Sequence, residues 1–225
     1  CWELQITTPA ASFEEYTLTL TDGEQSVTLQ HLLIGEVWLC AGQSNMVMPL
    51  NGFDYCPISD SNNVIADAPN HPGIRMVTIK PTVKLSPQEY AEGSWQQPTT
   101  ENAPKFSAAA YHYALTLQRT LQIPIGVITC AWGGSRVEGW LPKEILQTYK
   151  DEDLTLIGSD KTPVYLQSML MYNGILYPCH KYTIKGFIWY QGESNVRSSR
   201  TYAERLATMV KHWRSIWKQG DLPFY

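Results

Sequence analysis

The sequence has little positive charge, and this scarcity excludes one class of partner. Lys and Arg number 17 against 21 Asp and Glu in 225 residues, which gives a formal net charge of −4. A nucleic-acid surface needs clustered basic side chains to neutralise phosphates, so we expect no nucleic-acid partner. The sequence also has no uninterrupted apolar run of the length that crosses a bilayer, so we expect no membrane partner.

The sequence motifs of common cofactor sites are missing as well. The 5 cysteines contain no C-x-x-C pair, which argues against a zinc or iron–sulfur site. Neither G-x-G-x-x-G nor G-K-[ST] occurs, which argues against a loop that cradles phosphates. We therefore expect no metal and no organic cofactor.

What the sequence does have is apolar and aromatic side chains in the proportions of a globular protein. Hydrophobic residues make up 44% of the chain and charged residues 17%. With 8 Trp and 13 Tyr, aromatic residues reach 12%. Such rings either stiffen a core or line a cleft that faces carbohydrate, because flat rings stack on sugar faces. Composition leaves both interpretations open.

The first part of the chain has the pattern of antiparallel strands. The stretch "YTLTLTDGEQSVTLQHLLIG" alternates apolar and polar residues on both sides of Asp22 and Gly23. An Asp-Gly pair between two such runs predicts a hairpin turn. We interpret residues 1–34 as the end of an N-terminal β-rich domain.

From residue 35 the pattern changes to strands that alternate with helices. Apolar runs predict buried strands at 36–42 and 73–80 and in the segments 125–134 and 185–195. Helices are expected at 105–122 and 201–220, with buried stripes formed by Phe106, Ala110, Tyr113, Leu117 and Leu121 in the first and Tyr202, Leu206, Met209, Trp213 and Trp217 in the second. Gly220 is expected to cap the second helix, and 47–72 to form a long loop with at most one helical turn. The alternation predicts an α/β fold with a parallel sheet flanked by helices.

Three of the expected strands end in similar sequences. These are "AGQSNM" at 41–46, "AWGGSRVEGW" at 131–140 and "WYQGESN" at 189–195. Each combines glycine with small polar residues, and the carboxyl ends of parallel strands share one edge, where ligands bind. We expect the three segments to meet there.

The residue types at this edge suit acyl transfer. That chemistry needs an accessible serine hydroxyl at a sharp turn and several N–H donors around the oxygen that becomes negative. Ser44 provides the hydroxyl and its own N–H, and Gly134 provides a second backbone N–H. A side-chain amide of Gln191 or Asn195 would be a third donor. Taken alone, Ser44 is equally well explained as a turn residue that caps a helix.

The motifs "GEVWLCAGQSNM", "AWGGSRVEGWLP" and "FIWYQGESN" resemble, in order, the sialate O-acetylesterase and acetylxylan esterase branch of the SGNH (GDSL-like) hydrolases. The resemblance covers residues 35–225 and implies the flavodoxin-like three-layer fold of that superfamily. It implies a serine esterase that removes O-acetyl groups from carbohydrates, such as 9-O-acetyl sialic acid or acetylated glycans. It also implies a secreted, periplasmic or lysosomal location.

The resemblance also implies roles for individual residues. Ser44 is the expected nucleophile, and Gly134 and Gln191 are the expected oxyanion donors, with Asn195 as the alternative to Gln191. Substrate contacts are expected from Arg136, Glu193 and Trp140. Arg136 would pair with Glu193 or Glu138, or would meet a substrate carboxylate, while Glu193 would orient Arg136 or a loop backbone, and Trp140 would border an acyl pocket.

A general base is the missing part of this interpretation. The family carries an Asp-x-x-His pair near its C-terminus, but none of the five histidines here has an Asp three residues before it: His31, His71, His112, His180 and His212. Because the chain starts at Cys1 and ends in "GDLPFY", where an apolar run begins, we expect an incomplete domain. A parallel strand is expected to begin at Leu222, and the catalytic His and Asp are expected beyond Tyr225. The alternatives are a carbohydrate-binding protein that does not hydrolyse, and a thioesterase or peptidase on the same scaffold. The sequence does not indicate an oligomeric state.

Overall fold

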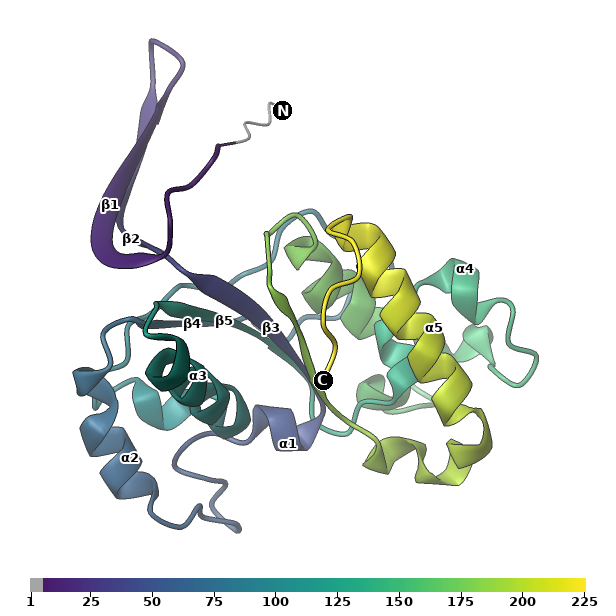
Figure 1. Cartoon of the computed structure of the whole chain (residues 1–225). Coiled ribbons are helices and arrows are strands. Elements are labelled where there is room, and N and C mark those ends of the chain that lie inside the picture. Colours follow the sequence, from purple (N-terminus) through teal and green to yellow (C-terminus); the bar gives the residue numbers. More distant parts are fainter. Residues whose placement is uncertain (1–5) are drawn as a thin grey trace.

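The first feature of the fold is a long hairpin that precedes the main body of the molecule. The computed structural model describes residues 6–225, so Cys1 and the start of the predicted β-rich segment lie outside it. Strands β1 (Ser12–Thr21) and β2 (Ser26–Ile34) pair antiparallel around the Asp22–Gly23 turn, as predicted. Gly23 has φ +98°, and the Asp22 carboxylate accepts the N–H groups of Glu24 and Gln25. The hairpin projects from the body at the upper left of Figure 1.

The body is built on a four-stranded parallel sheet in the order β4-β5-β3-β6. Its strands are β3 (Glu36–Gly42), β4 (Ile74–Thr78), β5 (Ile125–Ala131) and β6 (Gly186–Tyr190). All neighbouring strands pair in parallel, which confirms the predicted parallel α/β sheet. Every strand therefore presents its carboxyl end to the same edge.

Side chains alternate along each strand into two separate cores, one on each face of the sheet. In β3, Trp38 and Cys40 pack in one core, while Leu39 and Ala41 pack in the other. This alternation is what a strand covered on both faces requires. The layers are visible in Figure 1, where α3 covers one face and α5 the other.

Residues 6–225 form five α-helices around the sheet. They are α1 (Ser44–Val47), α2 (Ser61–Asp67), α3 (Ala108–Leu121), α4 (Lys143–Leu146) and α5 (Ser199–Trp217). Short 3-10 or π-helical turns are η1 (Ala68–Asn70), η2 (Ala103–Lys105), η3 (Val137–Trp140), η4 (Leu154–Leu156), η5 (Val164–Leu166), η6 (Tyr172–Leu176), η7 (Tyr177–Cys179) and η8 (Glu193–Ser198). The segment 47–72 was predicted to hold at most one helical turn, and that prediction is wrong because α2 alone has 7 residues. None of the helices in residues 6–225 is both long and apolar enough to cross a membrane.

The buried stripe of α3 differs from the predicted one. Ser107 caps the helix by accepting the N–H of Ala110 at 3.3 Å, so Phe106 lies before the first turn and outside the helical period. The residues that the helix buries are Ala108, Ala110, Tyr111, Ala114, Leu115 and Gln118. Leu121, predicted to be buried, is 43% exposed. Aromatic and aliphatic residues lie on both sides of the buried stripe, so the sequence pattern did not show which residues form its centre.

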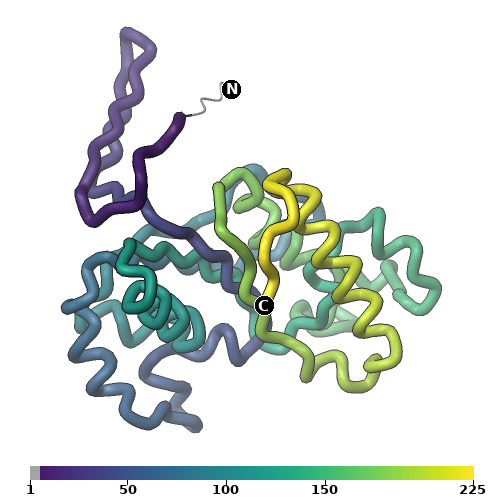
Figure 2. The backbone as a smooth tube through the Cα atoms, in the orientation of Figure 1, coloured from purple at the N-terminus to yellow at the C-terminus, as the bar shows by residue number. Residues whose placement is uncertain are grey.

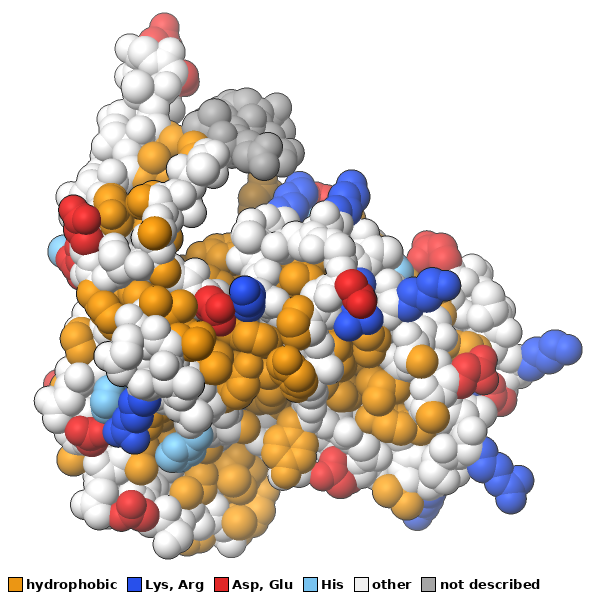
Figure 3. Space-filling model, viewed as in Figure 1, with side chains coloured by type: hydrophobic (Ala, Val, Ile, Leu, Met, Phe, Trp, Pro, Cys, Tyr) orange, Lys and Arg blue, Asp and Glu red, His pale blue; other side chains and the backbone are white. Residues whose placement is uncertain are grey.

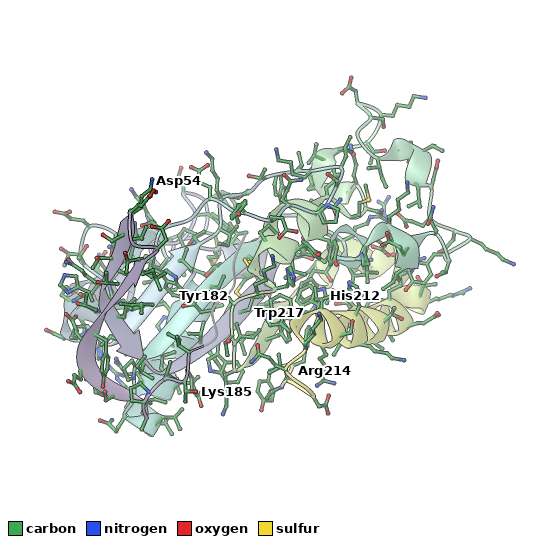
Figure 4. All side chains as sticks on the ribbon, turned by 90° about the horizontal axis from the view of Figure 1, so that it is seen from above. Asp54, Tyr182, Lys185, His212, Arg214 and Trp217 are labelled. Atoms are coloured by element: carbon green, nitrogen blue, oxygen red, sulfur yellow. The ribbon has the colours of Figure 1, made fainter. Side chains whose placement is uncertain are left out.

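The last helix follows its predicted stripe closely. Met209, Trp213 and Trp217 are buried at a spacing of four, and Arg205 extends the same stripe by one turn. The predicted cap at Gly220 is wrong, because Lys218 takes the left-handed conformation with φ 55°. In Figure 4 the labelled residues Arg214 and Trp217 are carried by this helix.

After α5 the chain returns to the sheet and runs parallel to β6. The N–H of Phe187 donates to Pro223, the N–H of Trp189 donates to Tyr225, and the N–H of Tyr225 donates to Phe187. A strand was expected from Leu222 onward; within the described residues the pairing there is an isolated parallel bridge between Phe187 and Phe224. Figure 2 shows the C-terminal segment alongside β6, and Figure 3 shows hydrophobic side chains gathered across the middle of the same face, with charges of both signs scattered around them.

Candidate active site

The three segments singled out in the sequence meet at one edge of the sheet. Gly42, the last residue of β3, lies opposite Ala131 of β5 and Tyr190 of β6. Just beyond the strands, the N–H of Trp132 donates to the Gly42 carbonyl at 3.0 Å, and the N–H of Gln43 donates to the Tyr190 carbonyl at 3.0 Å. The loops that follow these three strands therefore start side by side.

Ser44 lies where β3 turns into α1. It is the first residue of that helix and is half-buried. In the part of the chain that the structure describes, no protein group makes a hydrogen bond with the Ser44 hydroxyl or the Ser44 N–H. The Ser44 side chain makes no capping hydrogen bond, so the four-residue helix does not explain why a serine stands at its first position. The hydroxyl and the N–H are thus available to a ligand.

Gln43 joins the serine turn to the third segment. The residue is only 3% exposed, and its side-chain Oε1 accepts the N–H of Gly192 at 3.2 Å and the N–H of Ser194 at 3.3 Å. Buried polar groups are normally paired in this way, because an unpaired one costs about 1–3 kcal/mol. Gln43 was not among the predicted site residues, although its place beside Ser44 in the sequence was an available signal.

Gly134 has a backbone that favours glycine. Its φ is +76°, in the left-handed region, and a Cβ there would lie 2.8 Å from Cδ2 of Tyr165. Within the described residues no carbonyl accepts the Gly134 N–H. The next residue, Ser135, is buried, and its hydroxyl accepts the indole N–H of Trp140 at 3.0 Å. The turn after β5 therefore leaves a backbone donor available.

The two amides proposed as a third donor both have partners. Gln191 donates from Nε2 to the Ser135 carbonyl at 3.0 Å and to Asn195 Oδ1 at 2.9 Å. Asn195 is 1% exposed; its Oδ1 also accepts the N–H of Val137 at 2.9 Å, and its Nδ2 donates to Glu138 at 3.0 Å. Asn195 is therefore placed inside the scaffold, whereas Gln191 is half-buried at the edge of the site.

A buried cluster of charges lies behind Asn195. Glu138 is 0% exposed and contacts the guanidinium of Arg205, which comes from α5. Arg205 also binds Asp151 at 2.7 Å, and its guanidinium carbon lies 4.7 Å from the ring centre of Tyr149. A buried charge needs such partners because desolvation is costly. Sequence reasoning missed the cluster, since its members are far apart along the chain.

The residues expected to touch substrate have other contacts here. Arg136 donates to the Leu166 carbonyl at 3.0 and 2.8 Å and to Glu152 at 2.8 Å, so it is held by the protein, while its distance to Glu138 is 3.8 Å. The exposed Glu193 does not meet Arg136; it accepts from Asn45 Nδ2 at 2.7 Å. Of the two partners predicted for Arg136, the structure shows Glu138 and not Glu193.

Trp140 is likewise a core residue in the structure. It is 0% exposed and packs edge-on against Trp189 and Trp213, with ring centres 5.8 and 6.4 Å away. A side chain with no exposed surface does not border an open pocket. Its contribution is to support the loop that carries Gly134.

No histidine of the described residues stands next to Ser44. His71 pairs with Asp67 at 2.9 Å, but both precede β4 and lie at the opposite end of the sheet. His212 is 2.9 Å from the Tyr172 hydroxyl, and burial lowers its pKa below 6.5. The remaining histidines bond to Glu15 (His31) and to the Tyr177 carbonyl (His180), or lie exposed on α3 (His112). Among residues 6–225 no cluster of His, Cys, Asp and Glu has the arrangement of a metal site.

Tyr202 is a further residue that the sequence analysis left unassigned at the site. Its hydroxyl donates to Gln191, with both the carbonyl and Oε1 at 3.0 Å. Burial is the main cause that raises the pKa of this phenol, so it stays a donor at neutral pH. Together with Asn195, it fixes both ends of the Gln191 amide.

The whole body of the chain matches a known family. The model for "carbohydrate esterase, sialic acid-specific acetylesterase" matches residues 34–225. Sialate O-acetylesterase of Homo sapiens is 27% identical over 205 residues, covering 87% of this chain and 38% of that protein. The Rattus norvegicus protein of the same name is 25% identical over 238 residues, covering 90% and 43%. The chain thus spans about two fifths of the length of these relatives.

Solved structures agree with this match. A carbohydrate acetylesterase from Xanthomonas citri superimposes with a TM-score of 0.84 and 30% identity, covering 99% of this chain and 48% of that one. A protein of Arabidopsis thaliana gives a TM-score of 0.52 at 17% identity, covering 84% of this chain and 71% of that one. The second likeness concerns the fold alone.

Proposed function

The chain belongs to the carbohydrate esterase family of sialic acid-specific acetylesterases, and we propose on that premise that its Ser44 site removes O-acetyl groups from carbohydrates. One observation carries the proposal. Ser44 combines an unpaired hydroxyl with an unpaired N–H at a strand end, and the loop of Gly134 starts directly beside it. A nucleophile next to backbone donors is the arrangement that acyl transfer needs.

In the proposed reaction, the Ser44 oxygen attacks the carbonyl carbon of the acetyl group. The serine proton passes to a base, and the carbonyl oxygen becomes an oxyanion that accepts the N–H groups of Ser44 and Gly134. The intermediate collapses, the sugar alcohol leaves with the proton from the base, and an acetyl-serine remains. Water then attacks this ester in the same way, which releases acetate and restores Ser44.

We propose Gln191 rather than Asn195 as the third oxyanion donor. Gln191 is half-buried at the edge of the site, whereas Asn195 is 1% exposed and bonded on both sides of its amide. To donate, Gln191 would exchange its 3.0 Å bond to the Ser135 carbonyl for one to the oxyanion. Tyr202 would keep the amide oriented during this exchange.

The base that the reaction needs is proposed to come from outside residues 1–225, as a histidine oriented by an aspartate. Four histidines of the described chain are bonded to other groups, and the fifth, His112, is exposed on α3 and makes no hydrogen bond with Ser44. The same observation favours the alternative, a carbohydrate-binding protein that uses this edge without hydrolysis. The same measurements of acetate release decide whether the acetylated sugar is a sialic acid or another glycan.

The test compares the intact protein that contains these residues with its Ser44→Ala variant. Acetate release is measured on O-acetylated sialic acid, acetylated xylan, a longer acyl ester and an acyl thioester, with Ser215→Ala on the exposed surface of α5 as a control. We expect acetylated sugars to be preferred and Ser44→Ala to lose activity by on the order of 10⁴-fold. Full activity in Ser44→Ala would refute the nucleophile, and binding without acetate release by the wild type would favour the alternative.

A further inference from the structure

Tyr165 presents an aromatic ring beside the proposed oxyanion donor Gly134. A Cβ built on Gly134 would meet three ring atoms of Tyr165, Cδ2 at 2.8 Å, Cε2 at 3.2 Å and Cγ at 3.4 Å. The glycine therefore allows the ring to lie directly against the backbone of the turn. The side chain nevertheless remains 41% exposed, so the ring has both a packed part and an open part.

The segment that carries Tyr165 is fastened on both sides. Arg136, two residues after Gly134, donates twice to the carbonyl of Leu166, at 3.0 and 2.8 Å. Gln167, which is 3% exposed, accepts the N–H of Gly158 at 2.6 Å and donates to Thr162 at 2.7 Å. A ring held on such a support loses little freedom on binding a ligand, which is the benefit of preorganisation.

We propose that Tyr165 is a specificity residue that stacks on the sugar ring whose acetyl group lies at Ser44, and this inference rests on the proposed function. Ser44 and Gly134 follow neighbouring strand ends that are paired through Gly42 and Ala131. A substrate whose carbonyl oxygen meets both N–H groups places its alcohol part over the rim of the site. Tyr165 supplies an exposed aromatic surface at that rim, and flat rings bury apolar sugar faces well.

Arg136 then has a role that differs from binding a substrate carboxylate. Its guanidinium donates to the Leu166 carbonyl and to Glu152, each at 2.8 Å. It therefore affects substrate binding only by holding Tyr165 in place. Arg136 is thus a positioning residue for the stacking ring. The substrate class that fits is an O-acetylated pyranose with one exposed C–H face.

The experiment compares Tyr165→Ala and Tyr165→Phe with Tyr182→Ala in the intact protein. Tyr182 is a matched control, because it is 45% exposed and precedes β6 at the opposite end of the sheet; Figure 4 labels it. Hydrolysis of an O-acetylated monosaccharide is compared with that of ethyl acetate, which has no ring. We expect Tyr165→Ala to raise KM for the sugar about tenfold and to leave ethyl acetate within about twofold. Tyr165→Phe and Tyr182→Ala should match the wild type.

Equal losses on both esters in Tyr165→Ala would overturn the inference, because the ring would then only support the Gly134 turn. Unchanged kinetics on both esters would overturn it as well. If the wild type releases no acetate, binding of the unacetylated methyl glycoside is measured by saturation-transfer NMR. Binding that Tyr165→Ala loses and Tyr165→Phe keeps would support stacking while the esterase proposal fails, and absent binding by the wild type would refute both.

Discussion

A Cβ atom on Gly42 would lie 2.1 Å from the carbonyl oxygen of Tyr190. That oxygen already accepts the N–H of Gln43 at 3.0 Å, so it cannot move away without loosening the join between β3 and β6. The φ of Gly42 is +147°, a conformation that residues with a side chain rarely adopt. The glycine that precedes the serine turn is therefore required by the close approach of two strands.

We expect Gly42→Ala to lower the free energy of unfolding by about 2–4 kcal/mol, because both the contact and the backbone are strained. Gly133→Ala is the control, since a Cβ at Gly133 meets nothing within 4 Å. It should change stability by less than about 1 kcal/mol. Equilibrium denaturation of both variants measures the difference, and equal stabilities would show that the β3–β6 join relaxes around a methyl group.

Asn195→Ala tests whether the buried amide holds the second and third segments together. Its loss would leave the Val137 N–H and part of Glu138 without partners in a dry interior. We expect a drop of about 3 kcal/mol in the free energy of unfolding. Val196→Ala, at a neighbouring side chain that is 69% exposed, should be close to neutral. Denaturant titrations compare the two, and a neutral Asn195→Ala would mean that water replaces the amide.

Stability should fall on acidification because of His212. Burial lowers the pKa of this imidazole below 6.5, while Glu144 acts weakly in the opposite direction. The unfolded chain therefore binds a proton more readily than the folded one. The stability contributed by neutral His212 is complete above pH 6.5 and is lost as the pH falls towards the lower folded pKa.

The measurement is the free energy of unfolding at about pH 7.5 and about pH 5 for the wild type and for His212→Gln. We expect the wild type to lose more stability over this interval than the variant, which has no imidazole to charge. The Tyr172 hydroxyl, 2.9 Å from Nε2, is present in both proteins. Parallel losses in the two proteins would assign the acid sensitivity to other groups.

The strands and the edge where they end could be predicted because local patterns determine them. In "EVWLCAG" the residues between Glu36 and Gly42 are all apolar, and such a short run that ends in glycine favours a strand buried on both faces. The stripe of α3 was less predictable, because Tyr111 and Tyr113 are both aromatic and only tertiary packing decides which one is buried. The cap of α5 was predicted wrongly because Lys218 adopts a left-handed backbone, which costs a residue with a side chain conformational energy and which glycine adopts freely.

Ser44 and Gly134 could be singled out since turn, glycine and serine are adjacent in the sequence. The residues that pack behind these two could not be singled out from the sequence. Arg205 meets Glu138 across 67 positions of sequence, and Gln43 meets Gly192 across 149. Tyr165 comes from a loop with no repeating pattern, so its contact with Gly134 depends on the path of the whole segment. Such pairings follow from the fold and leave no periodic trace in the sequence.

The direction of β3 has a practical consequence. The strand enters the sheet from the β1–β2 hairpin and ends at Gly42, two residues before Ser44, so the hairpin and the serine lie at opposite ends of a strand about 20 Å long. A tether fixed at the exposed Asp22–Gly23 turn would attach the protein to a bead or chip. The end of β3 that leads to Ser44 would then face the solution.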